Sequence, residues 1–118
     1  MRFPLILALA PLLMQAEVRF NRDIRPILAE KCFACHGPDS NARQADLRLD
    51  RRADAVARGV FDAKLIERIN HPNEALRMPP VYSNKTLSDE QKTLLTDWVK
   101  QGAEYEAHWA YIPPQRAS

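Results

Sequence analysis

The chain has 118 residues, of which 46% are hydrophobic and 27% charged, a composition typical of one modest globular domain. Its formal net charge is only +2, and no basic block interleaved with aromatic residues occurs, which argues against nucleic-acid binding. A chain of this size buries a limited core, so a metal, cofactor or covalent cross-link often adds to its stability.

The first sixteen residues differ in character from the rest of the chain. Residues 1–16 carry one charge, Arg2, followed by an apolar run over residues 3–13. This layout predicts a secretory signal peptide over residues 1–16. The run is too short to span a bilayer, and Pro4 and Pro11 disfavour a buried helix. We therefore expect export to the periplasm or another extracytoplasmic compartment, with no stable membrane span in the mature chain.

The first helix of the mature chain is predicted over residues 20–32. Asn21 or Asp23 is expected to cap it, because a short polar side chain accepts hydrogen bonds from the free N–H groups of the first turn. Pro26 falls near that turn, where its missing N–H costs little. One apolar stripe follows the helical period and faces the expected core: Ile24, Ile27, Leu28 and Cys32.

The middle of the chain gives weaker signals. Residues 47–50 alternate leucine with polar residues over too short a stretch to predict a strand. Residues 51–59 predict a short helical turn that ends at Gly59. Residues 62–70 predict a second helix, with Asp62 as its cap and apolar residues at helical spacing.

The clearest helix lies within residues 87–103. Ser88 and Gln91 fit a capping box, and Gly102 supplies the C-terminal stop. Leu94, Leu95, Trp98 and Val99 form its apolar face. The sequence thus predicts an all-α domain of three mostly short helices joined by long loops. Structureless loops of such length usually serve a function.

The two cysteines of the chain lie three residues apart, directly before a histidine. Cys-x-x-Cys-His is the attachment signature of c-type haem. Cys32 and Cys35 would form thioether bonds to the two vinyl groups of one porphyrin, and His36 would bind the iron. We therefore predict a single, covalently bound haem c.

Three other roles compete with haem attachment for the cysteine pair. A thioredoxin-like redox pair belongs near a βαβ pattern, which the sequence lacks. A structural disulfide closing so small a loop would stabilise the fold little. Zinc binding would call for a closely spaced histidine pair, whereas His71 and His108 lie 37 residues apart.

Met78 is the leading candidate for the second axial ligand of the iron. The other two methionines, Met1 and Met14, lie within the predicted signal peptide. Pro79 directly follows Met78 and disfavours helical backbone there, and Pro80 stiffens the loop further. The competing interpretations are that Met78 fills a gap in the core, or that His71 is the ligand instead.

Five stretches of the sequence resemble a class I cytochrome c domain, and more closely the planctomycete-type cytochrome c family. They are FNRDIRPILAEKCFACHGPD, LRLD, RMPP, LSDEQKTLLTDWVKQGA and HWAYIPP. The resemblance implies a small helical fold wrapped around haem c, with His36 and Met78 as axial ligands and Cys32 and Cys35 as thioether anchors.

The resemblance also implies a domain organisation. Residues 17–104 would form the cytochrome c domain. Residues 105–118 would be a C-terminal tail, or a linker to a further domain, since such domains usually open a much longer chain.

Electron transfer is the function that these expectations favour. A His/Met-ligated iron leaves no open position for a substrate, and a thioether ligand raises the redox potential. The domain would therefore be an electron carrier rather than an enzyme, exchanging electrons with an unidentified redox partner protein or domain. The alternative is a five-coordinate haem c enzyme or gas-sensing domain in which Met78 is not a ligand.

Further candidates concern the surroundings of the haem. We expect apolar side chains to bury the ring, and the candidates are Phe33, Ile69, Leu94, Leu95 and Trp98. Cationic side chains are expected to pair with the haem propionates, and the candidates are Arg43, Arg48, Arg51, Arg52, Arg77 and Lys85.

Overall fold

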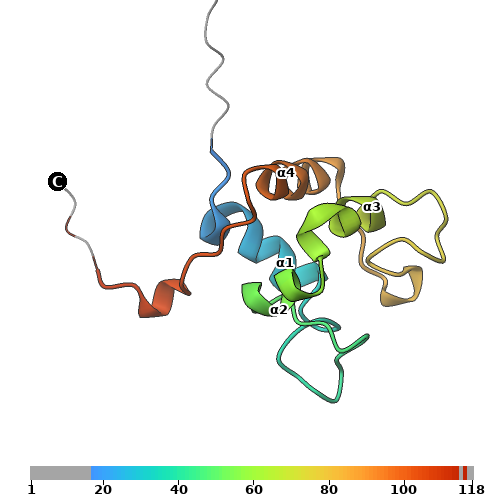
Figure 1. Cartoon of the computed structure of the whole chain (residues 1–118), viewed down its shortest axis with the longest axis horizontal. Coiled ribbons are helices and arrows are strands. Elements are labelled where there is room, and N and C mark those ends of the chain that lie inside the picture. Colours follow the sequence, from blue (N-terminus) through green and yellow to red (C-terminus); the bar gives the residue numbers. More distant parts are fainter. Residues whose placement is uncertain (1–16, 115, 117–118) are drawn as a thin grey trace, which may run out of the picture.

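The computed structural model describes residues 17–114 and residue 116 (Figure 1). In this part of the chain every regular element is helical and no strand occurs, which confirms the predicted all-α class. The predicted signal peptide over residues 1–16 lies outside the described residues. Among the helices of residues 17–114, none has the length and apolar character that crossing a bilayer requires.

The elements are short and are joined by long connections. In chain order they are η1 (Phe20–Ile24), α1 (Arg25–Lys31), α2 (Arg52–Ala57), η2 (Val60–Lys64), α3 (Leu65–Ile69), η3 (Val81–Ser83), α4 (Asp89–Lys100) and η4 (Trp109–Tyr111). The expected three helices are therefore four α-helices, because the short turn predicted near residue 52 forms α2.

The first helix begins where the sequence predicts, but its capping differs. The helical backbone starts at Phe20 in a π turn, so Asn21 and Asp23 lie inside the helix rather than at its cap. The Asp23 carboxylate still accepts a hydrogen bond from the Arg19 backbone N–H, at 2.8 Å. Pro26 lies in the first turn of α1, as predicted, where no hydrogen bond is lost.

The cap expected for the predicted helix over residues 62–70 is wrong, whereas that of the last helix is confirmed. Gly59 has a left-handed backbone (φ +66°) and ends α2, and the next helical stretch starts directly afterwards at Val60, so Asp62 is internal to it. On α4, Ser88 and Gln91 form the reciprocal capping box. Gly102 (φ +109°) follows its C-terminus as predicted.

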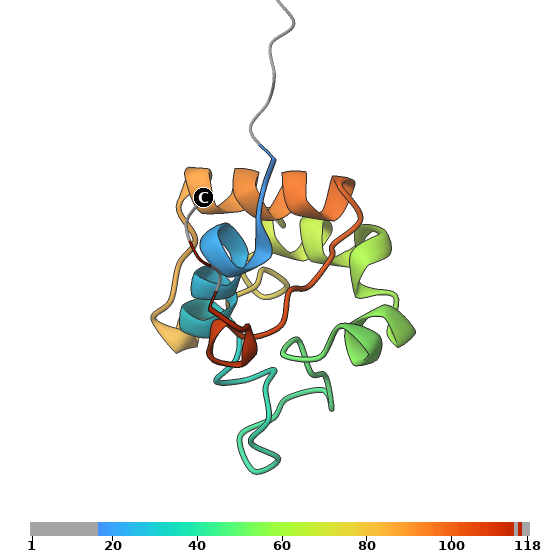
Figure 2. The ribbon, with the colours of Figure 1, turned by 90° about the vertical axis from the view of Figure 1, so that its left-hand side faces the viewer.

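The core lies where α4 crosses the first helix and α3 (Figures 1 and 2). Its centre is an aromatic cluster of four side chains: Phe20, Phe61, Trp98 and Tyr105. Phe20 stacks on Tyr105 with ring centroids 4.3 Å apart, and the edge of Phe61 meets Trp98 at 5.1 Å. The Trp98 indole N–H donates to the Glu104 carbonyl at 3.0 Å, so the polar group of this buried ring has a hydrogen-bond partner.

The segment after α4 returns to the start of the fold. Arg25 donates to the Glu106 carbonyl at 2.9 Å, and the Asn21 amide donates to the Ala107 carbonyl at 2.8 Å. Beyond these contacts the chain leaves the helical body, as Figure 1 shows. Trp109 and Tyr111 on η4 are exposed.

Candidate functional site

The Cys-x-x-Cys-His motif forms a compact turn at the end of α1. The Cys32 N–H donates to the Leu28 carbonyl and closes the last helical turn. The Cys35 and His36 N–H groups then donate to the Cys32 carbonyl, at 3.2 and 2.9 Å. The two cysteines are not bonded to each other. Both thiols and the imidazole are therefore carried on one hydrogen-bonded turn.

Glycine is required directly after the histidine. A Cβ atom at Gly37 would lie 2.2 Å from the Phe33 carbonyl oxygen, closer than real contacts allow. Any other residue would force the backbone of the motif to open. This requirement is invisible in the sequence, because it arises from the way in which the turn folds back on itself.

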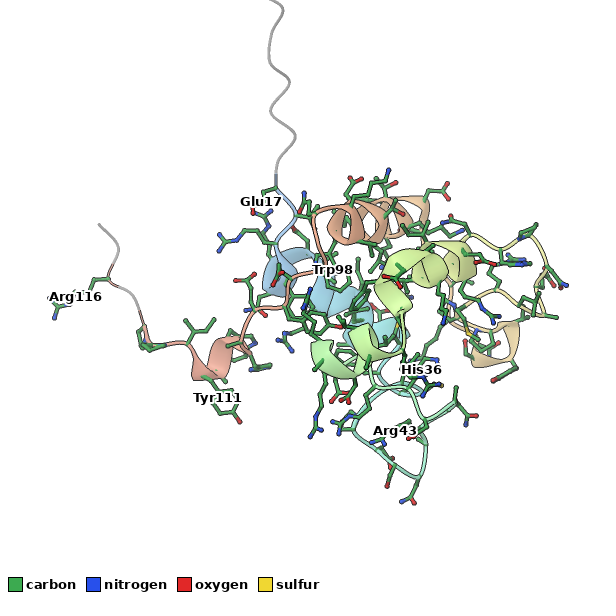
Figure 3. All side chains as sticks on the ribbon, viewed as in Figure 1. Glu17, His36, Arg43, Trp98, Tyr111 and Arg116 are labelled. Carbon is green, nitrogen blue, oxygen red and sulfur yellow. The ribbon has the colours of Figure 1, made fainter. Side chains whose placement is uncertain are left out.

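The loop that follows returns to the backbone of the motif. The Gln44 N–H donates to the Cys35 carbonyl at 2.7 Å, and the Leu49 N–H donates to the His36 carbonyl at 2.8 Å. In Figure 3 His36 lies at the inner end of this loop, with Arg43 further out along it. These two bonds fix the loop against the cysteine turn.

The His36 imidazole is held by the same loop. Its Nδ1 atom lies 3.2 Å from the Gln44 carbonyl oxygen. Because a carbonyl oxygen only accepts, this hydrogen bond places the proton on Nδ1 and leaves the Nε2 lone pair free. Burial lowers the pKa of His36, and the hydrogen bond to Gln44 opposes that shift only in part. The imidazole is thus neutral near pH 7, the form that binds metals.

Met78 is held by contacts with the end of α3. The Met78 N–H donates to the Arg68 carbonyl at 3.0 Å, and the Arg68 guanidinium donates back to the Leu76 carbonyl at 3.1 Å. Its backbone is not helical, as Pro79 predicts. Further along, Lys85 reaches the Glu30 carbonyl at 2.7 Å and ties the methionine loop to α1.

One cavity of about 290 Å³ brings the four predicted site residues together. Cys32, Cys35, His36 and Met78 all line it. Much of the remaining wall is apolar and comes from the loop before α2, from η2 and α3, and from the methionine loop: Leu47, Leu49, Val60, Leu65, Ile69, Pro79, Pro80 and Leu87. Residues that lie 46 positions apart in the sequence thus meet at one site.

The charge on the cavity wall has one sign. Five cationic side chains line the cavity, and no carboxylate does: Lys31, Arg58, Lys64, Arg68 and Lys85. Arg58, Lys64, Arg68 and Lys85 direct hydrogen bonds to backbone carbonyls, which carry no full negative charge. An apolar cavity with a cationic wall is suited to a large apolar ligand that carries anionic groups.

The cysteine closest to the core is a protonated thiol. Burial raises the pKa of Cys32 to about 11, although the nearby Lys85 charge acts in the opposite direction. At neutral pH such a thiol is not a thiolate, which argues against Cys32 as the reactive cysteine of a redox pair.

Most of the side chains expected to bury the haem ring do not line the cavity. Ile69 lies on the cavity wall, whereas Leu95 and Trp98 are buried in the core and do not line the cavity. Phe33 and Leu94 pack against the core from its edge. Sequence reasoning missed Leu47 and Leu49, although leucines two residues apart in a non-helical stretch were a usable signal for a shared face.

Of the cations expected to meet the propionates, only Lys85 lines the cavity. The others have partners elsewhere: Arg43 bonds to the Gly37 and Pro38 carbonyls, Arg48 to Asp50, Arg51 to Asp54, Arg52 to the Ala103 carbonyl and Arg77 to the His71 carbonyl. Lys31, Arg58, Lys64 and Arg68 were missed. Nothing in the sequence distinguishes these four residues from the other basic residues.

The competing ligand candidate is placed elsewhere. His71 does not line the cavity, and its Nδ1 accepts a hydrogen bond from the Asn73 N–H at 3.0 Å. In the described part of the chain, no group of three or more His, Cys, Asp or Glu side chains gathers in a way that would hold a metal ion.

Comparison with known proteins adds a family to this geometry. Residues 32–81 match the family described as Planctomycete cytochrome C. The match starts at the first cysteine, includes the histidine and Met78, and ends within η3. Neither the curated proteins nor the solved structures gave a significant match. Together with the cavity geometry, this match over residues 32–81 supports a cytochrome c domain of the planctomycete family in that part of the chain.

Proposed function

We propose that residues 17–104 form an electron-transfer domain that binds one haem c, with His36 and Met78 as the axial ligands of the iron. A cytochrome c domain implies haem c and electron transfer as its general function. Beyond this general function, we propose which residues hold the haem, which two of them coordinate the iron, and that the domain acts as an electron carrier. The observation that carries it is the meeting of Cys32, Cys35, His36 and Met78 on one cavity wall.

The cavity residues fit the chemistry of this cofactor. A porphyrin offers two apolar faces, two vinyl groups and two carboxylates. The cavity offers apolar walls, two thiols on one turn and cations without a carboxylate among them. The deprotonated Nε2 of His36 and the thioether of Met78 are the two donor types that c-type haems use.

Each residue of the site has a distinct task. Cys32 and Cys35 anchor the ring by thioether bonds, which fixes its position without a contribution from the iron. The His36 Nδ1–H group donates a hydrogen bond to the Gln44 carbonyl, and this bond sets the orientation and basicity of the imidazole. Met78 supplies a soft ligand that favours reduced iron and so raises the potential. The apolar wall excludes water and acts in the same direction.

With His36 and Met78 both holding the iron, the domain would be an electron carrier rather than an enzyme. Substrate chemistry or gas binding at iron would require an open position, as in the five-coordinate alternative. The methionine loop is held to α3 by the Met78 and Arg68 hydrogen bonds, so the thioether stays beside the cavity at little further entropic cost.

The wider setting is also part of the proposal. A signal peptide over residues 1–16 would deliver the chain to the periplasm or another extracytoplasmic compartment, where haem attachment takes place. Residues 105–118 would form a tail or a linker to a further domain. The domain would then be the redox module of a larger exported protein, with an unidentified protein or domain as its electron partner.

The first test concerns attachment. Protein produced with a haem-ligation system should be red, and its mass should exceed that of the polypeptide by one haem. A mass equal to that of the bare polypeptide from such a host would overturn the proposal.

The second test concerns Met78. Wild-type haem in the reduced state should resist carbon monoxide, because a bound thioether must first leave the iron. Met78→Ala should bind carbon monoxide readily and have a lower midpoint potential, since the preference of the thioether for reduced iron is lost. Pro79→Ala, the control in the same loop, should have the smaller effect because the ligand remains. Equal carbon monoxide binding and equal potentials in wild type and Met78→Ala would favour the five-coordinate alternative.

A further inference from the structure

We propose that Arg58 is a positioning residue for the proximal histidine. Its guanidinium holds the turn formed by residues 44–46, and this turn presents the carbonyl that orients the His36 imidazole. The inference rests on the proposed function, in which His36 is an iron ligand.

The contacts form a short chain from α2 to the imidazole. The Arg58 guanidinium donates to the Ala45 carbonyl at 3.0 Å and to the Asp46 carbonyl at 3.3 Å. The preceding carbonyl, that of Gln44, accepts from His36 Nδ1 at 3.2 Å. Three successive carbonyl groups thus have side-chain donors, two of them from the same guanidinium.

The 44–46 turn needs such a restraint. Ala45 (φ +55°) and Asp46 (φ +50°) both adopt left-handed backbone, which is unfavourable for residues with a Cβ atom. Two such residues in succession persist only where surrounding contacts impose them. The Arg58 fork supplies contacts to both of these residues. The Leu47 N–H also donates to the Gln44 carbonyl, at 3.2 Å, whereas the Arg58 fork holds the next two carbonyls. Without the fork, Ala45 and Asp46 would be expected to relax and to shift the Gln44 carbonyl relative to His36.

Arg58 is itself well fixed. It follows α2, and its N–H donates to carbonyls of that helix. Its own carbonyl accepts from the Lys64 ammonium at 3.1 Å, across the left-handed Gly59. The Asp46 carboxylate lies 3.5 Å from Arg43, so the acidic side chain of this turn is directed to another arginine. The Arg58 side chain is exposed, but it extends to the turn from a backbone that is held at the end of α2.

The consequence would appear at the iron. A hydrogen bond from Nδ1–H to a carbonyl makes the imidazole a stronger donor, and it prevents rotation of the ring. A stronger donor stabilises oxidised iron and lowers the potential. Arg58 would therefore lower the potential through the 44–46 turn, whereas its positive charge alone would raise it. These opposite signs allow the positioning role to be separated from a simple charge effect.

The test compares Arg58→Met with Lys85→Met in the protein that carries haem. Both substitutions remove one positive charge from the cavity wall, but Lys85 bonds to Glu30 and does not touch the turn. The readouts are the hydrogen-exchange rate of the His36 Nδ1 proton, measured by NMR on the reduced protein, and the midpoint potential. We expect Arg58→Met to speed this exchange about tenfold, the order expected for loss of one hydrogen-bonded restraint. Lys85→Met should leave it unchanged.

The potential gives a second, independent readout. The charge control for this readout is Lys31→Met, because Lys31 lines the same cavity and touches neither the turn nor the methionine loop. Lys31→Met should lower the midpoint potential by loss of charge. Arg58→Met should have a higher potential than Lys31→Met, because the weakened His36 hydrogen bond acts against the loss of charge. Unchanged proton exchange together with a potential as low as that of Lys31→Met would overturn the inference and assign Arg58 a purely electrostatic role.

A rescue experiment tests the strain argument directly. Glycine adopts left-handed backbone without the Cβ cost, so Ala45→Gly should steady the turn without Arg58. Adding Ala45→Gly to Arg58→Met should restore part of the slow proton exchange, and absence of any rescue would contradict the positioning role. If Arg58→Met does not fold, Arg58→Lys replaces it. That variant keeps the charge but loses the fork, so it should show intermediate exchange, and wild-type exchange in it would count against the inference.

Failure of the inference is distinct from failure of the proposed function. Absence of covalent haem, or absence of an iron-bound His36, in the wild-type protein would refute the proposed function. Wild-type protein that holds haem through His36, with proton exchange that does not depend on Arg58, would refute only the positioning role.

Discussion

The aromatic cluster and the cavity are two apolar regions of the same small fold, but the chain fills only one of them. In the cluster, Phe20, Phe61, Trp98 and Tyr105 contact one another directly, and the indole N–H and the phenol O–H both have backbone partners. The cavity wall is largely aliphatic, includes no Phe, Tyr or Trp side chain, and encloses about 290 Å³. A domain this small does not leave apolar surface open without a cause. We infer that the haem completes the second half of the core.

The double variant Cys32→Ala, Cys35→Ala should give the largest effect on this comparison. Without covalent haem the cavity stays unfilled, so we expect the protein to lose most of its cooperative unfolding. Thermal denaturation monitored by circular dichroism measures this loss. Wild-type protein made without a haem-ligation system is the matched control and should behave in the same way. If either form unfolds as cooperatively as the haem-bound protein, the cavity half does not depend on the cofactor.

Trp98→Ala should give the next largest effect, on the other half. Trp98 is 2% exposed and contacts three other aromatic rings, so its removal should lower the free energy of unfolding by about 3–5 kcal/mol. Chemical denaturation measures this value. Trp109→Ala is the control: that ring is 70% exposed, and its loss should change stability by less than about 0.5 kcal/mol. Since Trp98 does not line the cavity, the absorption spectrum of bound haem should stay the same.

Tyr105→Phe tests the connection between the two halves. The Tyr105 hydroxyl donates to the Leu49 carbonyl at 2.6 Å, and the Leu49 side chain lines the cavity. Removing the hydroxyl leaves a carbonyl without its partner and should cost about 1–2 kcal/mol in unfolding experiments. Tyr111→Phe, at an 84% exposed position, should cost nothing measurable. Equal stability of the two variants would show that the two halves are not coupled through this bond.

Asp50→Asn should give the smallest effect, visible only in acid. The hydrogen bond from Arg48 holds the pKa of Asp50 below its usual value of 3.8. The stability that this pair contributes is therefore present above that value and is lost as the pH falls below it. Because both side chains are partly exposed, we expect about 1 kcal/mol or less at pH 7. Acid titration of Asp50→Asn should show a shallower loss of stability below pH 4 than wild type, and identical slopes would show that the pair contributes nothing.

The parts of the fold that follow local periodicity could be predicted from the sequence. The stripe of Ile24, Ile27 and Leu28 is buried, and the face of α4 packs inward as its spacing indicates. Helix starts were less predictable where two helical stretches adjoin. Gly59 ends one helix and immediately precedes the next, so the cap expected at Asp62 was not needed.

The candidate site divides in a similar way. The Cys-x-x-Cys-His spacing and the setting of Met78 before two prolines are local signals, and they led to four residues that share one cavity. The cations on its wall depend on which arginine or lysine the tertiary fold turns inward, and basic residues are common along the whole chain. The left-handed backbone at Ala45 and Asp46 was not predictable either, because neither residue is a glycine and the guanidinium that contacts both carbonyls comes from Arg58, after the end of α2.

The hydrogen bonds between Asn21 and the segment at Glu106 and Ala107 also have an architectural meaning. They place the segment that enters the helical body beside the segment that leaves it. A unit whose entry and exit adjoin can be inserted into a surface loop of a host protein, or repeated in tandem, without stretching the host's backbone. The Asn21 contacts thus suit this domain to such insertion, because the host needs to supply only a gap as wide as two hydrogen-bonded segments of chain.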